Sequence, residues 1–174
     1  LEAAKARGRY IGRHHSETSH FYKSIALLPL LELAAVSGDS YFQDLAFEIA
    51  DEQGLAFLKL AAHGAAAATI ADAHLEMYEL TGDRRYLDNA LEGWQAVRDR
   101  MFVTGGLGEV LDFTKPPSES DVLCETCQVS WWLMLNLHLS QTTGDPKYMD
   151  LAERILYNHF AFSHLFPVDK NING

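Results

Sequence analysis

Three copies of one short pattern constrain what this chain can fold into more than any other feature of its sequence. Residues 37–46, 81–90 and 143–152 read Ser-Gly-Asp-Ser-Tyr-Phe-Gln-Asp-Leu-Ala, Thr-Gly-Asp-Arg-Arg-Tyr-Leu-Asp-Asn-Ala and Thr-Gly-Asp-Pro-Lys-Tyr-Met-Asp-Leu-Ala. The glycine of each copy can adopt the positive φ that ends a helix, and the aspartate after it can cap the next helix. Each copy therefore predicts a helix, a tight turn and a second helix. The glycines are Gly38, Gly82 and Gly144, and the aspartates are Asp39, Asp83 and Asp145.

Apolar residues recur at helical spacing on both sides of every turn. We expect helices upstream of the turns over residues 20–36, 61–80 and 124–142, and downstream over residues 41–54, 85–100 and 147–162. The second helix of each pair is expected to begin its apolar face with a tyrosine, namely Tyr41, Tyr86 and Tyr148. No segment shows the alternation of apolar and polar residues that is typical of strands.

The spacing of the helix pairs indicates how they are arranged. Gly38 and Gly82 are 44 residues apart, whereas Gly82 and Gly144 are 62 apart, and a strict solenoid would keep a constant period. We therefore predict an all-α fold in which helical hairpins form an (α/α)6-type toroid. The toroid is expected to be incomplete, because three clear hairpins are present where six are needed. A plain α-solenoid is the alternative. Residues 1–174 form a single domain or a fragment of one.

Charge and hydropathy exclude several classes of partner. With 14 lysines and arginines against 24 aspartates and glutamates, the formal net charge is −10. Nucleic acids and anionic membranes attract clustered basic residues, so neither is expected as a partner, whereas a neutral carbohydrate is compatible with this charge. No apolar run approaches the ~18–20 residues that span a bilayer. The oligomeric state is left open.

The two ends of the chain give little information about the compartment. The sequence begins Leu-Glu-Ala-Ala-Lys, without an initiator methionine or the layout of a signal peptide, and it stops in the polar segment Asn-Ile-Asn-Gly. We interpret both ends as cut from something longer. The compartment is therefore unknown, and the lack of a signal peptide only weakly favours the cytoplasm.

A long insert separates the second and third hairpins. Residues 101–127 are rich in glycine and carry two prolines, and a loop of this kind on a rigid helical scaffold is where function usually lies. Glu109 and Glu125 lie on either side of it, and glycoside hydrolysis commonly needs two carboxyl groups near the scissile bond. The alternative is that Glu109 is a solvated loop acid and Glu125 a helix N-terminal charge favoured by the macrodipole.

The segment Cys124-Glu125-Thr126-Cys127 offers thiolate and carboxylate donors that suit zinc. A zinc site needs about four ligands, and the chain has no second cysteine pair, so the ligand set is incomplete. The alternative is two buried thiols at a helix start. Two cysteines three residues apart also argue against a disulfide-stapled scaffold.

The histidines and tryptophans carry weaker signals. His63 precedes the alanine-rich stretch 64–68, where small side chains let helices or a ligand approach closely. His74 is interpreted as a core or rim residue. We interpret His138, His159 and His164 as structural or exposed and assign them no role. Trp131 and Trp132 could stack on sugars, but core packing is the commoner use of such residues.

Several motifs together resemble the catalytic domain of glycoside hydrolase family 127. They are Met-Phe-Val-Thr-Gly-Gly-Leu-Gly at 101–108 followed by Glu109, then Glu-Thr-Cys at 125–127, then Glu-Arg-Ile-Leu-Tyr-Asn at 153–158, with His63 nineteen residues before Gly82. The resemblance runs from His63 to Asn158. It implies an (α/α)6 barrel followed by β-sandwich domains, and a retaining activity like that of β-L-arabinofuranosidases.

The resemblance also implies roles for particular residues. Enzymes of this family are thought to hold zinc through a glutamate and three cysteines, one of which is the nucleophile. Glu125 and Cys127 match the first two ligands, and Glu109, sixteen residues before Glu125, matches the general acid/base. His63 is expected to bind substrate. Cys124 is an extra cysteine that could substitute for a ligand.

The chain also departs from the family pattern. The paired cysteines that supply the nucleophile have no counterpart here, and the loop between Gly106 and Glu109 is shorter than usual. The chain alone is therefore expected to be an inactive fragment of a carbohydrate-active enzyme. The alternative is a non-catalytic carbohydrate-binding or interaction scaffold on the same toroid. A third reading, by fold analogy, is a sugar epimerase or an unsaturated-glycan hydrolase.

Overall fold

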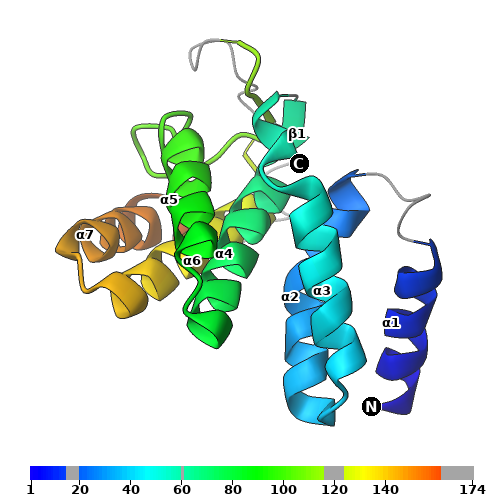
Figure 1. Ribbon diagram of the computed structural model, residues 1–174. Coiled ribbons are helices and arrows are strands. Elements are labelled where there is room, and N and C mark those ends of the chain that lie inside the picture. The colour runs from blue at the N-terminus through cyan, green and yellow to red at the C-terminus, as the bar shows by residue number, and fades with distance from the viewer. Residues whose placement is uncertain (15–19, 60, 116–123, 162–174) are drawn as a thin grey trace, which may run out of the picture.

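The computed structural model describes residues 1–14, 20–59, 61–115 and 124–161, and seven α-helices lie within them (Figure 1). The helices are α1 (Glu2–His14), α2 (His20–Ser37), α3 (Ser40–Gln53), α4 (Gly64–Thr81), α5 (Arg84–Arg98), α6 (Thr126–Thr143) and α7 (Pro146–Ile155). Short elements between or after them are a 3₁₀ turn (Ala56–Lys59), strands β1 (Ala61–His63) and β2 (Val110–Asp112), and a π-helical turn (Leu156–Phe160). The three predicted helix pairs are confirmed as α2–α3, α4–α5 and α6–α7.

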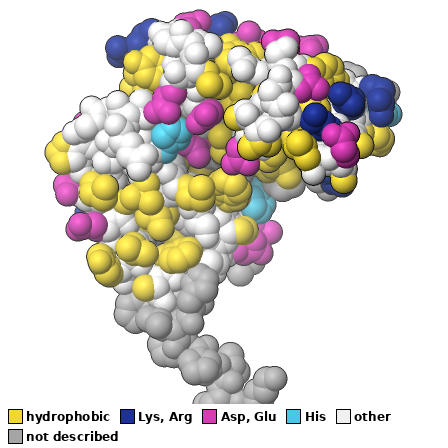
Figure 2. All heavy atoms as spheres, turned by 90° about the horizontal axis from the view of Figure 1, so that it is seen from below, with side chains coloured by type: hydrophobic (Ala, Val, Ile, Leu, Met, Phe, Trp, Pro, Cys, Tyr) yellow, Lys and Arg dark blue, Asp and Glu magenta, His cyan; other side chains and the backbone are white. Residues whose placement is uncertain are grey.

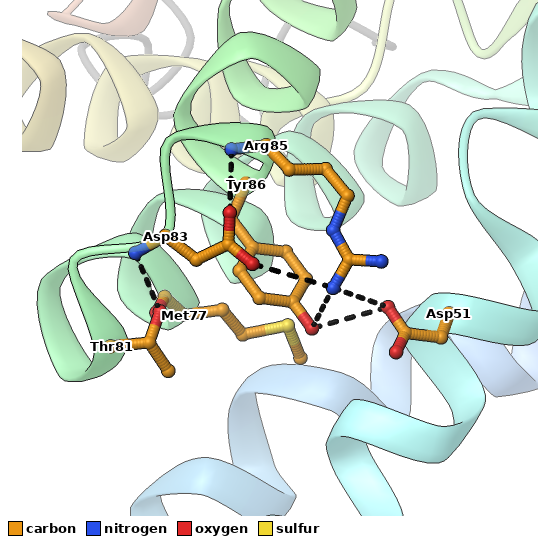
Figure 3. Close-up of polar contacts among 6 residues, drawn as sticks. All are labelled: Asp51, Met77, Thr81, Asp83, Arg85 and Tyr86. Carbon is orange, nitrogen blue, oxygen red and sulfur yellow. Dashed lines mark hydrogen bonds and ion pairs between the residues drawn. The ribbon is translucent and has the colours of Figure 1, made fainter.

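The repeated turns have the backbone that the pattern predicts. Gly38, Gly82 and Gly144 have φ values of 65°, 69° and 70°. The aspartate after each glycine caps the next helix: its carboxylate accepts a hydrogen bond from a backbone N–H two residues on, at 3.2, 2.9 and 3.0 Å. The hydroxyl group before each glycine also takes part, because it accepts from the N–H of that aspartate at 3.1–3.2 Å. Figure 3 shows these bonds at the second turn.

One expectation about the downstream helices is wrong. Tyr41 is exposed, whereas Phe42 next to it is fully buried. Phe42, and not Tyr41, occupies the same position of the pattern as the buried Tyr86 and Tyr148. A buried aromatic ring, phenylalanine or tyrosine, therefore fills this position in all three copies. Matching the tyrosines alone selected the wrong residue at the first turn.

The structure also contains a small sheet that the sequence did not predict. Strands β1 and β2 pair antiparallel, with Ala61 opposite Asp112, Ala62 opposite Leu111 and His63 opposite Val110. The first residues of the helix expected over 61–80 thus form a strand, and α4 begins only at Gly64. Alanine favours helix locally, but a partner strand far along the chain decides the conformation here.

The hairpins are arranged in two layers. Helices α2, α4 and α6 pack against one another in that order and are the inner helices. Helices α3, α5 and α7 are the outer helices, and each packs mainly on its own hairpin partner (Figure 1). Helix α4 is therefore central, with contacts to α2, α5 and α6. It is buried on most of its circumference because its first half consists of small residues at positions 64–68.

The hydrophobic core has two parts that meet at α4. One part joins α2 and α3 to Ala73 and Met77 of α4, and the other joins α4 and α5 to α6 and α7. Trp132 is fully buried in the second part and stacks on Trp94, with ring centroids 6.1 Å apart. Trp132 therefore has the core-packing role.

Polar contacts add a link between the first two hairpins (Figure 3). The Tyr86 hydroxyl of α5 donates to Asp51 of α3 at 3.1 Å, and Arg85 Nη2 donates to the same hydroxyl at 3.1 Å. Arg85 also forms an ion pair with Asp51 at 3.5 Å. The Arg85 side chain is 58% exposed and the Asp51 side chain 50%. Ion pairs this exposed contribute little stability, so the link mainly orients the outer helices.

The surface is mixed in character. In the view from below, hydrophobic side chains lie between groups of acidic ones (Figure 2). Within the described part of the chain, no helix has the length and apolar character needed to cross a membrane.

We expect Gly82→Ala to lower the free energy of unfolding by about 1 kcal/mol, because a left-handed conformation strains any residue that has a Cβ. No atom lies within 4 Å of the added Cβ, so backbone strain is the whole effect. Denaturant unfolding measures it. Asparagine tolerates this conformation better, so Gly82→Asn should lose less; equal losses for the two variants would contradict the prediction.

We also expect the stability to fall as the pH is lowered from 6.5 towards 4. His74 is 1% exposed, and burial lowers its pKa to about 4. The unfolded chain, with a histidine pKa of about 6.5, binds a proton in this window that the folded chain does not, which costs about 2–3 kcal/mol by pH 4.5. Urea unfolding at pH 7 and 4.5 measures the loss. His74→Gln should show a smaller loss between the two pH values, and an unchanged pH dependence would argue against this role.

Candidate active site

Three segments that are far apart in the sequence converge at the N-terminal ends of α4 and α6. The Gly64 N–H, at the start of α4, donates to the Glu109 carbonyl oxygen at 2.9 Å. The pairing of His63 with Val110 in the small sheet fixes the same two segments beside each other. The amide group of Gln128, in the first turn of α6, lies against the His63 ring, with 3.3 Å between their Nε2 atoms.

Gly64 is needed because these segments approach so closely. A Cβ at this position would lie 2.6 Å from the Gly108 carbonyl oxygen and 3.1 Å from Gln128 Cγ. The first of these is a backbone atom, so relief would require one segment to move. The glycine therefore lets β1, the segment before β2 and α6 share one corner of the fold.

The side chains of His63, Glu125 and Cys127 form a donor cluster at this corner. One ring nitrogen, one carboxylate oxygen and the sulfur all lie within 4.8 Å of one another. The Cys127 thiol donates to Glu125 Oε2 at 3.3 Å. Partial burial raises the pKa of this thiol, and the hydrogen bond to the Glu125 carboxylate and its charge raise it further. The structure thus brings together the two residues expected to bind metal and the histidine expected to bind substrate.

Gln128 positions two members of the cluster. It is fully buried, and its Oε1 accepts from the Glu125 N–H at 3.1 Å while its Nε2 faces His63. Glu125 and Gln128 form a capping box at the start of α6. Gln128 is absent from the residues expected from the sequence, although the spacing Glu-x-x-Gln at a helix start was a signal that could have identified it.

Cys124 is held apart from the donor cluster. Its sulfur lies 3.0 Å from His159 Nε2, and His159 Nδ1 lies 3.1 Å from the Thr104 hydroxyl. Both side chains pack over Gly106, where an added Cβ would lie 2.6 Å from the His159 ring and 3.0 Å from the Cys124 sulfur. Burial raises the pKa of the Cys124 thiol. Cys124, considered above as a substitute ligand, therefore contacts a histidine to which the sequence assigned no role.

Glu109, the expected acid/base, lies one residue before β2. Its backbone is fixed to the start of α4 by the bond to Gly64, and its side chain is partly buried. Residues 101–115 of the inserted loop continue into the small sheet, whereas residues 116–123 lie outside the described residues. Glu109 thus belongs to the same corner of the fold as the donor cluster.

Solved structures with a similar fold define the class of protein. A β-arabinofuranosidase of family GH127 aligns with a TM-score of 0.65 and 26% identity, over 78% of this chain and 25% of that one. A family 76 glycoside hydrolase from a bovine Bacteroides thetaiotaomicron strain aligns with a TM-score of 0.65 and 18% identity, over 75% of this chain and 32% of that one. The second likeness concerns the fold alone. The chain is part of an all-α toroid of the kind found in glycosidases.

The family follows from the sequence itself. A family model described as the β-L-arabinofuranosidase GH127 catalytic domain matches residues 5–171, and the chain belongs to this family. The resemblance expected between His63 and Asn158 therefore extends over nearly the whole chain. A comparison with curated proteins found no match. The chain spans about a quarter of the length of the solved β-arabinofuranosidase and about a third of the length of the family 76 enzyme.

We expect Gly64→Ala to destabilise the fold by about 1–3 kcal/mol, the usual cost of overpacking, because its Cβ meets the Gly108 backbone. Thermal or denaturant unfolding checks this loss. Gly82→Ala is the matched control: it lies at the other end of α4, its Cβ meets no atom within 4 Å, and it should lose only the cost of the left-handed backbone. A Gly64→Ala protein as stable as the parent would show that the contact is relieved without cost.

Proposed function

We propose that this chain contributes part of the active site of a retaining glycosidase that acts on β-L-arabinofuranosides. The observation that carries the proposal is the convergence of His63, Glu125 and Cys127 at one corner of the fold, with the backbone of Glu109 bonded beside them. Family membership supports the substrate class and the reaction. The roles of individual residues follow from the matching motifs.

The donor set fits zinc. Thiolate, carboxylate and imidazole are its usual protein ligands, and three of them lie within 4.8 Å of one another here. Glu125 and Cys127 would hold the ion, with His63 close enough to be a third ligand or to contact the sugar. When bound, zinc lowers the pKa of a coordinated thiol and so supplies a nucleophile at neutral pH.

The remaining residues have positioning and proton-transfer roles. Glu109 is assigned the proton transfer: it donates a proton to the departing glycosidic oxygen and then takes one from the attacking water. Gln128 holds Glu125 through its backbone N–H and orients the His63 ring. The positive ends of the α4 and α6 dipoles favour negative charge at this corner, which suits a carboxylate and a thiolate.

The chain by itself is not expected to hydrolyse glycosides. The family mechanism needs a nucleophile from a pair of cysteines in addition to the Glu-Thr-Cys motif, and this sequence holds only Cys124 and Cys127. The sulfur of Cys124 is engaged by His159 and lies outside the donor cluster. Activity is therefore a property proposed for the longest native product that contains this chain.

We expect Glu109→Gln in that longest product to reduce kcat/KM, which reports the bond-breaking step, on an aryl β-L-arabinofuranoside by roughly 10²–10⁴-fold, the usual contribution of a general acid/base. The loss should be much smaller on a dinitrophenyl glycoside, whose leaving group needs no proton. A purely structural role for Glu109 would affect both substrates equally. Glu92→Gln, at an exposed position of α5, is the matched control and should leave both rates unchanged.

The same assay separates this proposal from the scaffold alternative. If the folded, zinc-supplied product hydrolyses no member of a panel of aryl glycosides but still binds arabinose-containing oligosaccharides, the proposal is wrong. The chain would then belong to a non-catalytic carbohydrate-binding protein. In that case Glu109→Gln should also leave oligosaccharide binding nearly intact.

A further inference from the structure

A second group of metal-binding side chains lies in the C-terminal halves of α4 and α6. It comprises Glu76 and Glu79 of α4 and His138 of α6. Glu76 is twelve residues along α4 from Gly64, or about 18 Å at the helical rise of 1.5 Å per residue. The group is therefore separate from the donor cluster of the candidate active site.

The imidazole of His138 is held by a buried carboxylate. Its Nδ1 lies 2.7 Å from Asp72 Oδ1, and the Asp72 side chain is only 7% exposed. Histidines that bind metals commonly donate their second ring N–H to such a carboxylate, which sets the tautomer and the orientation of the ring. With Nδ1 engaged by Asp72, Nε2 is the nitrogen left to bind a metal ion, and it lies 3.3 Å from Glu79 Oε2.

The two glutamates complete a set of three donors. Glu76 and Glu79 are three residues apart on α4, so they lie on the same face of the helix. One oxygen of each and one ring nitrogen of His138 lie within 4.8 Å of one another. The other oxygen of Glu79 accepts a hydrogen bond from the Thr142 hydroxyl of α6, which restrains the carboxylate.

The charge around the imidazole is unbalanced. Asp72, Glu76 and Glu79 surround it, and Glu32 of α2 adds a fourth carboxylate close enough to act on Glu76. Even with His138 protonated, the group retains excess negative charge at a partly buried position. A divalent cation would offset that charge and would join the inner helices α4 and α6.

We propose that Glu76, Glu79 and His138 bind one divalent transition-metal ion of the zinc type, with Asp72 orienting the histidine. Two carboxylates and an imidazole are a common ligand set for such ions and leave a coordination position open. Magnesium and calcium prefer oxygen ligands alone, so the imidazole argues against them. The site is independent of the proposed glycosidase activity.

The competing arrangement has a proton in place of the metal. The hydrogen bond that His138 donates to the Asp72 carboxylate raises the pKa of His138 to about 9. An imidazolium that bridges Asp72 and Glu79 would account for the same distances. The two arrangements differ in whether zinc reaches Nε2, and this can be measured.

The test titrates the chain with zinc ions by calorimetry in a background where Cys127→Ala and Glu125→Gln disable the first donor cluster. We expect one bound zinc per chain and a rise in the melting temperature. Adding Glu79→Gln or His138→Gln should weaken binding at least about tenfold, because even residues that only orient a ligand cost that much. Glu32→Gln is the matched control: it removes the same charge nearby and should change the affinity less than about threefold, because it removes no ligand.

Two results would overturn the proposal. One is no zinc binding in that background while the chain remains folded. The other is an equal loss of affinity in Glu79→Gln and Glu32→Gln, which would indicate diffuse attraction by acidic charge. If the background changes unfold the chain, NMR of the unaltered chain decides: zinc should shift the ¹⁵N resonance of His138 Nε2, and an unshifted resonance at saturating zinc contradicts the site.

Discussion

The packing of α4 against three other helices is the constraint on which the rest of this structure depends. A helix so enclosed has little room for side chains, and its first half is accordingly made of glycine and alanine at positions 64–68. Ala73 and Met77 extend the contact to the first hairpin, while Ala67 and Ala71 belong to the core that α4 shares with α5, α6 and α7. Larger side chains at these positions would separate the hairpins, because interiors are packed almost without voids. The two parts of the core are thus coupled through one helix.

The same close packing places the candidate active site. Since Gly64 has no side chain, the Gly108 carbonyl and the Gln128 side chain can both reach the start of α4. The backbone carbonyl of Glu109 is then bonded to α4 and the backbone N–H of Glu125 to Gln128, so the backbones of the two glutamates on either side of the insert are fixed at one corner. The scaffold is rigid and the insert is long, which is the usual division between stability and function. Changes in α4 far from any substrate should therefore alter the site.

Helices α4 and α6 carry different donor sets at their two ends. The N-terminal ends hold a thiol, a carboxylate and an imidazole, where the helix dipoles favour anions. The C-terminal halves hold carboxylates around His138. The proposed second ion would restrain the two inner helices whose other ends form the candidate active site.

The sequence by itself determined the features that depend on neighbours along the chain. The three hairpins follow from Gly-Asp turns, because positive φ at Gly82 and capping by Asp83 are local effects. The Glu-Thr-Cys motif likewise indicated the family.

Only the tertiary structure decided what depends on distant partners. Residues 61–63 became a strand by pairing with 110–112, and Cys124 came to contact His159 and not the donor cluster. His138, for which the sequence predicted no role, met Asp72 and Glu79 only because α4 and α6 pack together. Periodicity shows which face of a helix is apolar, but it does not show which polar groups the opposing helix brings to it.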